Sequence, residues 1–276
     1  MSEPVSLPFA KMEGTGNDYV YVDAIRDPLP LERAPVLARL WSDRHFGIGA
    51  DGLIALVRTA AAPLAMQMWN ADGSRGAMCG NGLRCLAQFA VTQGHAPGHA
   101  FGILTDAGPR TVELLRDERT ERGGGFARAG LGEVRCSEPV TVTVAGREVT
   151  LIPGDAGNPH AVCFVDDVER CDVLGIGAAL QRQARFPDGV NVEFVAITGP
   201  ASLRQRTFER GSGETLACGT GAAVAALAAR RRGLIRGEIV DVELRGGVLR
   251  VVPEGSSLAI EGPVRTVFTG RIELPV

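Results

Sequence analysis

A Cys-Gly-x-Gly segment occurs twice in this chain, at residues 79–82 and again 139 residues later at 218–221. Two further pairs of segments repeat in the same order. They are Gly-Asn ahead of an alternating apolar run, at 16–17 and 157–158, and Asp-Gly ahead of a strand-like run, at 51–52 and 188–189. Their offsets of 141 and 137 residues are close to half of the 276 residues. Three matches at nearly one offset indicate an internal duplication of one α/β half.

Each half is predicted to contain several short strands and one helix that begins directly after its Cys-Gly-x-Gly segment. In the first half, apolar residues follow helical spacing over 83–91, and Gly94 is a natural stop. In the second half, 222–229 is apolar on every side, which indicates a buried helix, and the arginines at 230–232 complement the negative end of its dipole. We therefore expect an α/β (α+β) fold with two pseudo-symmetric domains, each a mixed sheet wrapped around a central helix.

One glycine-rich stretch is a candidate boundary between the halves. The run at 123–125 follows a charged run at 116–122. It is either the linker between the halves or an exposed hairpin loop. We place the boundary next to it, with the first domain at 1–126 and the second at 127–264.

Charge and hydropathy exclude several classes of partner. The 29 Lys and Arg against 32 Asp and Glu give a net charge of −3, so no basic face for nucleic acid is expected. No apolar run approaches the roughly 18 residues that cross a bilayer, so we expect no contact with a membrane. Residues 1–10 lack a basic segment followed by an apolar one. We therefore expect a cytoplasmic protein whose six cysteines are mostly free thiols.

Neither a cofactor nor a metal is expected. Lys11 is the single lysine, so a pyridoxal Schiff base would have to form there, which we do not expect. The chain has no C-x-x-C or H-E-x-x-H segment, and its four histidines are scattered. Residues 47–52 fit the dinucleotide pattern G-x-G-x-x-G, but a strand-like run follows them instead of a helix. We interpret them as a turn that leads into a strand.

A cysteine at a helix N-terminus is suited to acid–base chemistry, because backbone N–H groups and the positive end of the dipole favour a thiolate and attract a carboxylate. If the two halves face each other, Cys79 and Cys218 flank one bound acid. One thiolate then takes the α-proton, and the opposite thiol returns a proton to the other side, as a racemase requires. Free cysteines are more often small buried hydrophobic residues, and we expect this of the other four, Cys85, Cys136, Cys163 and Cys171.

These segments and their neighbours resemble the diaminopimelate epimerase family. Its two signature segments are matched by A-D-G-S at 71–74 with M-C-G-N-G-L-R-C at 78–85, and by E-R-G-S-G-E-T at 209–215 with A-C-G-T-G at 217–221. Further matches in the right order are K-M-E-G-T-G-N-D at 11–18, G-N-P-H at 157–160 and G-V-N at 189–191. The resemblance covers nearly the whole chain. It implies a diaminopimelate epimerase-like fold with an active site between the domains, in which the last strand, at 265–276, returns to the first domain.

The resemblance also implies roles for single residues. The proton-transferring pair falls on Cys79 and Cys218, usually as donor and acceptor, and His160 and Glu209 match positions that help to set thiol protonation. The substrate contacts fall on Asn17, Asn70, Gly80, Asn81, Asn158, Asn191, Glu209, Arg210, Gly219 and Thr220. Backbone N–H groups at the helix starts suit the reacting carboxylate, the asparagines suit an ammonium or a carboxylate, and the arginine suits the remote carboxylate.

Two of these residues have simpler interpretations, and three positions depart from the family. His160 is equally a structural histidine satisfied in the core, and Glu209 beside Arg210 equally fits a surface ion pair. The departures are Glu13, where many members have His, Gly52, where some have a substrate-binding Gln, and Arg75, where an acidic residue is frequent.

The sequence therefore predicts an isomerase that epimerises LL-2,6-diaminopimelate to meso-diaminopimelate by a two-cysteine acid/base mechanism, without a cofactor, in lysine and peptidoglycan biosynthesis. The expected partner is the small-molecule substrate, and the resemblance implies a homodimer. Two alternatives stay open. One is a related pyridoxal-independent racemase of another amino acid, whose lack of a second carboxylate would leave Arg210 unpaired. The other is a non-catalytic amino-acid-binding relative.

Overall fold

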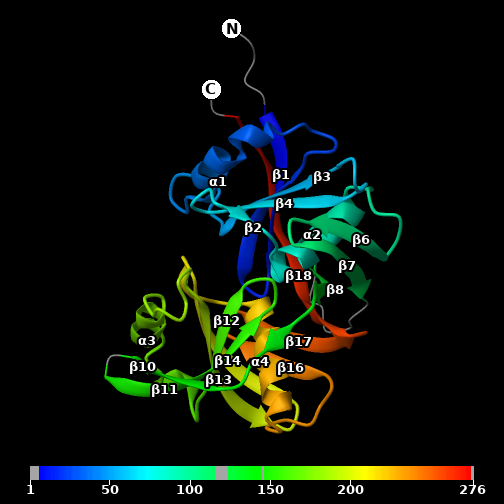
Figure 1. Cartoon of the computed structure of the whole chain (residues 1–276). Coiled ribbons are helices and arrows are strands. Elements are labelled where there is room, and N and C mark those ends of the chain that lie inside the picture. The colour runs from blue at the N-terminus through cyan, green and yellow to red at the C-terminus, as the bar shows by residue number, and fades with distance from the viewer. Residues whose placement is uncertain (1–5, 116–123, 145, 275–276) are drawn as a thin grey trace. The chain divides into compact units, whose positions relative to one another are not determined.

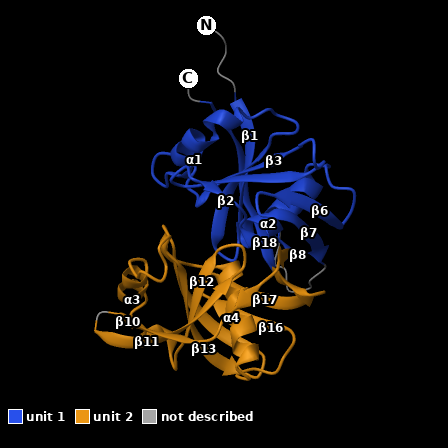
Figure 2. Cartoon of the chain, in the orientation of Figure 1, with its two compact units in different colours: residues 1–129, 262–276 blue, residues 130–261 orange. Residues whose placement is uncertain are grey.

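The computed structural model describes residues 6–115, 124–144 and 146–274 (Figure 1). The chain divides into two compact units, the first formed by residues 1–129 and 262–276 and the second by residues 130–261 (Figure 2). Each unit is a mixed sheet with a central helix, as the sequence predicts.

In the first unit, a mixed sheet combines strands from the first half of the chain with the later part of β18 (Ser257–Glu273). Its strands are β1 (Ser6–Gly14), β2 (Asn17–Asp23), β3 (Gly52–Val57), β4 (Ala65–Asn70), β5 (Arg75–Gly76), β6 (Ala100–Thr105), β7 (Gly108–Leu115) and most of β8 (Gly124–Gly132). Its helices are η1 (Leu31–Arg33), α1 (Ala34–Ser42) and α2 (Gly80–Thr92). The pairs β2–β3 and β4–β6 are parallel, and the pairs β1–β2, β3–β4, β4–β5, β6–β7 and β7–β8 are antiparallel.

The second unit has a similar set of elements. Its strands are β9 (Arg135–Cys136), β10 (Val140–Val144), β11 (Arg147–Asp155), β12 (Pro159–Phe164), β13 (Asn191–Gly199), β14 (Ser202–Glu209), β15 (Gly213–Thr215), β16 (Val240–Leu244), β17 (Gly247–Glu254) and the start of β18 (Ser257–Glu273). Its helices are η2 (Val168–Arg170), α3 (Val173–Leu180) and α4 (Gly219–Arg231).

Strand pairing in the second unit repeats that of the first. The parallel pairs β12–β13 and β14–β16 correspond to β2–β3 and β4–β6, and the antiparallel pairs β13–β14 and β14–β15 correspond to β3–β4 and β4–β5. The helices α2 and α4 follow the same strand, β5 or β15, in each unit. The duplication predicted from the sequence is therefore present in the backbone, and it relates positions of the two units one by one.

The two central helices begin and end as their sequences predict. Helix α4 is buried over most of its length because its side chains are small and apolar on all faces. Arg230 and Arg231 lie in its last turn, and Gly233 follows with φ 67°, the left-handed conformation that glycine adopts readily. Helix α2 is likewise buried on its apolar face, and Gly94 follows it with φ 77°.

The glycine run at 123–125 is not a linker between the halves. Gly124 and Gly125 begin β8, which pairs antiparallel with β7 in the first unit. Gly124 and Gly125 are therefore strand residues and do not form an exposed loop. The charged run at 116–122 and Gly123 lie outside the described residues.

The last strand is longer than the sequence predicts. Strand β18 begins at Ser257 and pairs antiparallel with β17, and its later part, up to Glu273, pairs antiparallel with β1. The later part of β18 thus pairs with β1 of the first unit. Among the described residues, no helix is both long enough and apolar enough to span a bilayer.

Candidate functional site

Each Cys-Gly-x-Gly segment places its cysteine at the N-cap of a helix. Cys79 has φ −128° and ψ 119°, and Cys218 has φ −120° and ψ 105°, extended conformations that suit the residue before a first turn. The Sγ of Cys79 accepts a hydrogen bond from the N–H of Gly82 at 3.4 Å. The Sγ of Cys218 lies 3.5 Å from Oγ1 of Thr220. Both sulfurs therefore lie at the positive end of a helix dipole, which stabilises negative charge.

In the first unit, Cys79 is the end of a chain of hydrogen bonds. Its thiol donates to Oδ1 of Asn17 at 3.1 Å, and Nδ2 of Asn17 donates to Oδ2 of Asp51 at 2.6 Å. Arg44 forms ion pairs with Asp51 at 2.9 Å and with Asp18 at 2.8 Å. Because Asp51 accepts from the amide nitrogen of Asn17, the amide oxygen is the atom turned toward the thiol.

Asn81 is anchored through its side chain to a buried arginine. Its Oδ1 accepts from Nη1 of Arg84 at 2.9 Å, and Nη2 of Arg84 donates to Oγ1 of Thr15 at 3.0 Å. Arg84 is fully buried, and burial lowers the pKa of its guanidinium. Gly80 and Asn81 are the first two residues of α2, so this anchor fixes the helix start next to Cys79.

Asn70 ends β4, with Gly52 opposite it on β3. The Nδ2 of Asn70 donates to Oγ of Ser74 at 2.9 Å. A Cβ atom at position 52 would lie 2.2 Å from the carbonyl oxygen of Trp69. This backbone therefore leaves no room for the Gln that some family members carry there.

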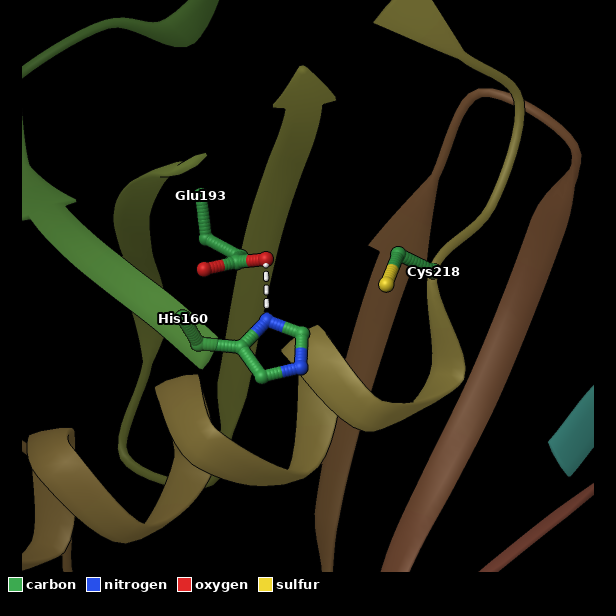
Figure 3. Close-up of side chains that lie close together, drawn as sticks. All are labelled: His160, Glu193 and Cys218. Carbon is green, nitrogen blue, oxygen red and sulfur yellow. Dashed lines mark hydrogen bonds and ion pairs between the residues drawn. The ribbon is translucent and has the colours of Figure 1, made fainter. Parts of the chain in front are cut away.

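In the second unit, three buried ionisable side chains meet at the start of α4, as Figure 3 shows. His160 comes from β12, Glu193 from the neighbouring strand β13, and Cys218 precedes α4. The Nδ1 of His160 lies 2.8 Å from Oε1 of Glu193, and its Nε2 lies 2.9 Å from Oδ1 of Asn158. One nitrogen, oxygen or sulfur atom from each of the three side chains lies within 4.8 Å of the other two.

Burial and the neighbouring carboxylates act on the pKa of Cys218 in the same direction. Burial raises the pKa of the Cys218 thiol well above its ordinary value, and the carboxylates of Glu209 and Glu193 raise it further. Hydrogen bonds from the Thr220 side chain and the Gly221 N–H oppose this. Burial also raises the pKa of Glu193, against the opposing effect of His160. Cys218 is therefore held as a thiol unless a nearby cation compensates.

The remaining predicted contacts of the second unit surround the end of β14. Asn191 donates from Nδ2 to the carbonyl of Pro159 at 3.0 Å and accepts from the Arg210 N–H at 3.0 Å. Oε1 of Glu209 accepts from Oγ1 of Thr215 at 2.5 Å. Nη1 of Arg210 donates to the carbonyl of Asp188 at 3.2 Å. The Arg210 guanidinium is thus hydrogen-bonded to the backbone of the segment that precedes β13.

The structure places the sequence-predicted residues in two groups, one in each unit. The first unit holds Asn17, Asn70, Cys79, Gly80 and Asn81, and the second holds Asn158, His160, Asn191, Glu209, Arg210, Cys218, Gly219 and Thr220. Direct hydrogen bonds join Cys79 to Asn17 and His160 to Asn158.

Three buried or bridging residues of these groups were missed in the sequence. Asp51 lies in the glycine segment that we interpret only as a turn, and Arg84 lies inside the signature segment at 78–85. Glu193 has a local signal, since a carboxylate two residues beyond Asn191 interrupts an otherwise apolar strand. A buried carboxylate requires a partner, but the sequence does not tell which one.

The donor types of the second-unit cluster, thiol, imidazole and carboxylate, are those that hold zinc. However, Nδ1 of His160 and Oε1 of Glu193 are already hydrogen-bonded to each other at 2.8 Å, and a metal ion would have to break this bond. We therefore interpret the cluster as a hydrogen-bonded acid–base group. Lys11 is buried and paired with Asp18 at 2.7 Å, and it also donates to the carbonyl of Gly49, so its amine is already occupied.

Three of the other four cysteines are buried as expected, and the fourth is only partly buried. Cys85, Cys136 and Cys163 are buried free thiols, whereas Cys171 is half-buried and its Sγ donates to the carbonyl of Asp167 at 3.2 Å. Burial raises the pKa of Cys85 to about 12 and that of Cys163 to about 11. Among these four, the structure therefore places none at a helix N-cap.

The amino-acid sequence matches the family model described as diaminopimelate epimerase over residues 9–136 and 154–267. A diaminopimelate epimerase of Geobacillus kaustophilus (strain HTA426) is 39% identical over 280 residues, which cover 96% of each protein. One from Leptospira biflexa serovar Patoc is 38% identical over 283 residues, covering 98% of this chain and 100% of the relative.

Solved structures with low sequence identity share the fold. A hydroxyproline epimerase from Agrobacterium vitis superposes with a TM-score of 0.76 at 15% identity, over 99% of this chain and 94% of the other. A PhzF-family phenazine biosynthesis protein from Bacillus anthracis gives a TM-score of 0.73 at 14% identity, over 98% and 100%. Proteins with different names thus share this architecture, so the fold alone does not assign an activity.

Proposed function

The chain belongs to the diaminopimelate epimerase family, and from this membership we propose that it interconverts LL-2,6-diaminopimelate and meso-diaminopimelate without a cofactor. The observation that supports the mechanism most directly is the duplicated N-cap cysteine. In each unit a thiol stands where the N–H groups of a helix start favour both a thiolate and a carboxylate.

In the proposed reaction, a thiolate at Cys218 removes the α-proton and becomes a thiol. The electron pair left on the α-carbon is delocalised into the adjacent carboxylate, which the helix N–H groups stabilise. The thiol of Cys79 then donates its proton to the opposite face of the carbon and becomes a thiolate. The reverse reaction exchanges the two roles. One turnover leaves Cys218 as the thiol and Cys79 as the thiolate, and proton exchange with solvent restores the starting state; no electron or other reactant is required.

The Cys79 thiol is already arranged to act as a donor. It donates a hydrogen bond to Oδ1 of Asn17 at 3.1 Å, and Asp51 fixes the orientation of that amide. Acid–base catalysis by positioned groups of this kind contributes about 10²- to 10⁴-fold in rate. His160 and Glu209 are proposed to set the protonation of the second thiol.

The proposed substrate contacts follow the family resemblance. Backbone N–H groups of Gly80, Asn81, Gly219 and Thr220 would bind the reacting carboxylate, and Arg210 the remote one. Asn17, Asn70, Asn158, Asn191 and Glu209 would bind the ammonium and carboxylate groups. These residues are all polar and stand at strand ends or helix starts of the two units.

The physiological setting is part of the same proposal. We place the reaction in lysine and peptidoglycan precursor synthesis in the cytoplasm, and we propose that the protein is a homodimer. Size-exclusion chromatography with light scattering tests the oligomeric state, and a monomeric mass at micromolar concentration would refute the dimer.

The decisive experiment is proton NMR of LL-diaminopimelate with the reduced protein in heavy water, without added pyridoxal or metal. The α-proton signal is expected to decay while meso product with deuterium at the inverted centre accumulates, because the second face is protonated from a solvent-exchanged thiol. If LL-diaminopimelate is unchanged but another L-amino acid is racemised, the protein is a racemase with another substrate. If no amino acid of the panel is turned over, it is a binding protein.

A further inference from the structure

The carboxylate of Glu193 has no acidic counterpart in the first unit, although the strand pairing of the two units corresponds position by position. Asn17 and Asn158 occupy the same place in the repeat, so Tyr21 corresponds to Val162. Tyr21 pairs with Ile54 across β2–β3, and Val162 pairs with Glu193 across β12–β13. Position 193 is therefore the equivalent of position 54, where the chain carries an apolar residue.

The helix-start glycines give the same correspondence independently. A Cβ atom at Gly82 would lie 2.7 Å from Cδ1 of Ile54, and a Cβ atom at Gly221 would lie 2.4 Å from Oε1 of Glu193. Both side chains thus use the space that a glycine leaves at the N-terminus of a central helix. In one unit this space holds a methyl group, and in the other it holds a carboxylate.

His160 shows the same asymmetry between the units. By the same offset, its counterpart in the first unit is Tyr19. The pair of His160 and Glu193, with both side chains fully buried, is thus present only beside Cys218. A fully buried carboxylate is costly unless it is paired, so its presence in one unit alone calls for a function specific to that unit.

The hydrogen bonds of this pair indicate the charge of the imidazole ring. The Nδ1 atom faces a carboxylate oxygen of Glu193, and Nε2 faces the amide oxygen of Asn158. When Glu193 is ionised, both facing oxygens are acceptors, and a ring that donates to both from its two nitrogens is an imidazolium. The Oε2 atom of Glu193 has no hydrogen-bond partner among the described residues, and the His160 ring is the largest of the groups that offset the burial of this carboxylate, ahead of the backbone N–H groups of Ala161 and Glu193.

We propose that Glu193 is a positioning residue that holds His160 as an imidazolium beside Cys218, and that this cation allows Cys218 to exist as the thiolate that removes the α-proton. This assignment rests on the proposed function and deepens it, because it explains why the two chemically identical cysteines differ in role. Glu193 acts through His160 and does not itself touch the substrate.

The negative charge of Glu193 can affect the Cys218 thiolate in two opposite ways, and these distinguish the proposal from direct electrostatic repulsion. The groups facing Cys218 are Glu209 from β14, Glu193 from β13, His160 from β12 and Thr220 from α4 itself. By direct repulsion, the negative charge of Glu193 disfavours the thiolate. By holding the imidazolium in place, it favours the thiolate. Removing the charge therefore gives results of opposite sign in the two cases.

The first test reads the ring directly and needs no substrate. The protein is labelled with ¹⁵N-histidine, and the signals of His160 among the four histidines are assigned with His160→Gln. We expect both ring nitrogens of His160 to be protonated at neutral pH, and one of them to lose its proton in Glu193→Gln, which has nearly the same shape but no charge. A neutral ring in the parent protein, or unchanged ring signals in Glu193→Gln, would overturn the proposal.

The second test reads the thiol. Cysteine labelled with ¹³C at Cβ reports the ionisation of Cys218, whose signal is assigned with Cys218→Ser. We expect Glu193→Gln to show less Cys218 thiolate at a given pH, and we expect no further loss when the same change is made in His160→Gln. An increase in thiolate in Glu193→Gln means direct repulsion and refutes the assignment, as does an equal loss with and without His160.

Kinetic measurements complete the test, and they distinguish a failure of the Glu193 assignment from a failure of the proposed function. Glu193→Gln is expected to lower kcat about tenfold with little change in KM and to be partly rescued by Glu193→Asp. Because less Cys218 is thiolate at a given pH, the acid limb of its pH–rate profile is expected to move to higher pH. Glu261→Gln removes another buried carboxylate of the same unit, paired with Arg250 at 3.9 Å, and is expected to leave kcat unchanged. If the parent protein epimerises nothing, the proposed function fails, while both NMR results still decide whether Glu193 controls His160 and Cys218.

Discussion

The Sγ atom of Cys79 lies 3.1 Å from Oδ1 of Asn17, and the thiol is the donor of that hydrogen bond. The amide of Asn17 cannot turn freely, because its nitrogen donates to Asp51 at 2.6 Å. Asp51 therefore determines, through Asn17, which amide atom Cys79 meets.

Asp51→Ala should lower kcat about tenfold by removing the acceptor that orients Asn17. The free amide can then present its nitrogen to Cys79 and favour a thiolate in place of the donor thiol. The measurement is kcat for LL-diaminopimelate together with the Cys79 Cβ chemical shift.

Asp106→Ala is the matched control. Asp106 pairs with Arg75 at 2.6 Å in the same unit and is half exposed, so its loss should leave kcat unchanged. Equal rates for Asp51→Ala and the parent protein would show that Asn17 needs no support.

Cys79→Ala and Cys218→Ala should each abolish epimerisation while the fold survives. The reaction needs one group to take a proton and another to give one, so a single cysteine cannot complete it. We expect kcat to fall by about 10² or more in each variant. Turnover is followed by NMR, and circular dichroism with a thermal melt checks the fold.

Cys171→Ala is the corresponding control, since Cys171 is a half-buried free thiol outside the helix N-caps. It should retain full activity. Undiminished turnover in either N-cap variant would exclude the two-cysteine mechanism.

Gly221→Ala should impair catalysis more than stability. The added Cβ would lie 2.4 Å from Oε1 of Glu193, so the carboxylate must leave its place beside His160. Overpacking of this kind costs about 1–3 kcal/mol, and alanine's higher helix propensity offsets part of it. We expect kcat to fall about tenfold, with a modest decrease in Tm.

Gly98→Ala serves as the comparison, because no atom lies within 4 Å of the Cβ position there. It should change neither quantity. A Gly221→Ala protein with the parent's kcat would mean that the placement of Glu193 is unimportant for the reaction.

Stability should fall as the pH rises above about 9, through two buried thiols. Burial raises the pKa of Cys85 to about 12 and that of Cys163 to about 11, from an ordinary value of 9.0. Between these values the unfolded chain has released the thiol proton and the folded chain has kept it. The unfolded state then binds fewer protons, so the free energy of unfolding falls by about 1.4 kcal/mol per pH unit for each thiol.

Urea unfolding at several pH values between 8 and 11 measures this slope. In Cys163→Ala the slope should be smaller by about the contribution of one thiol. An identical slope in both proteins would contradict the assignment of the effect to buried thiols.

The main features of the fold could be predicted because they depend on local sequence. The Cys-Gly-x-Gly segments determine where α2 and α4 begin, since a cap residue and small residues in the first turn act over a few positions. The repeat itself predicted two similar sheets. The start of β18 at Ser257 was not predicted, because its length depends on pairing with β17 and β1, which are distant in sequence.

The candidate site residues were taken from the repeated Cys-Gly-x-Gly segments and from the resemblance. Glu193 and Arg84 were missed because a charged residue in an apolar stretch looks the same whether it faces solvent or a buried partner. Only the fold brings Glu193 to His160 across the β12–β13 pair and Arg84 to Thr15. Gly52 was noted as a departure, but its close approach to the carbonyl of Trp69 could not be foreseen.

The pairing of β1 with β18 joins Ser6 to Glu273, almost the full length of the chain. During synthesis on the ribosome, the first unit therefore emerges early but cannot complete its sheet until the last strand has left the exit tunnel. Until then β1 presents an unpaired edge, the kind of surface that promotes aggregation. Removal of the last strand should therefore act as a defect of the N-terminal half, and production in cells should depend on chaperones that protect that half until synthesis ends.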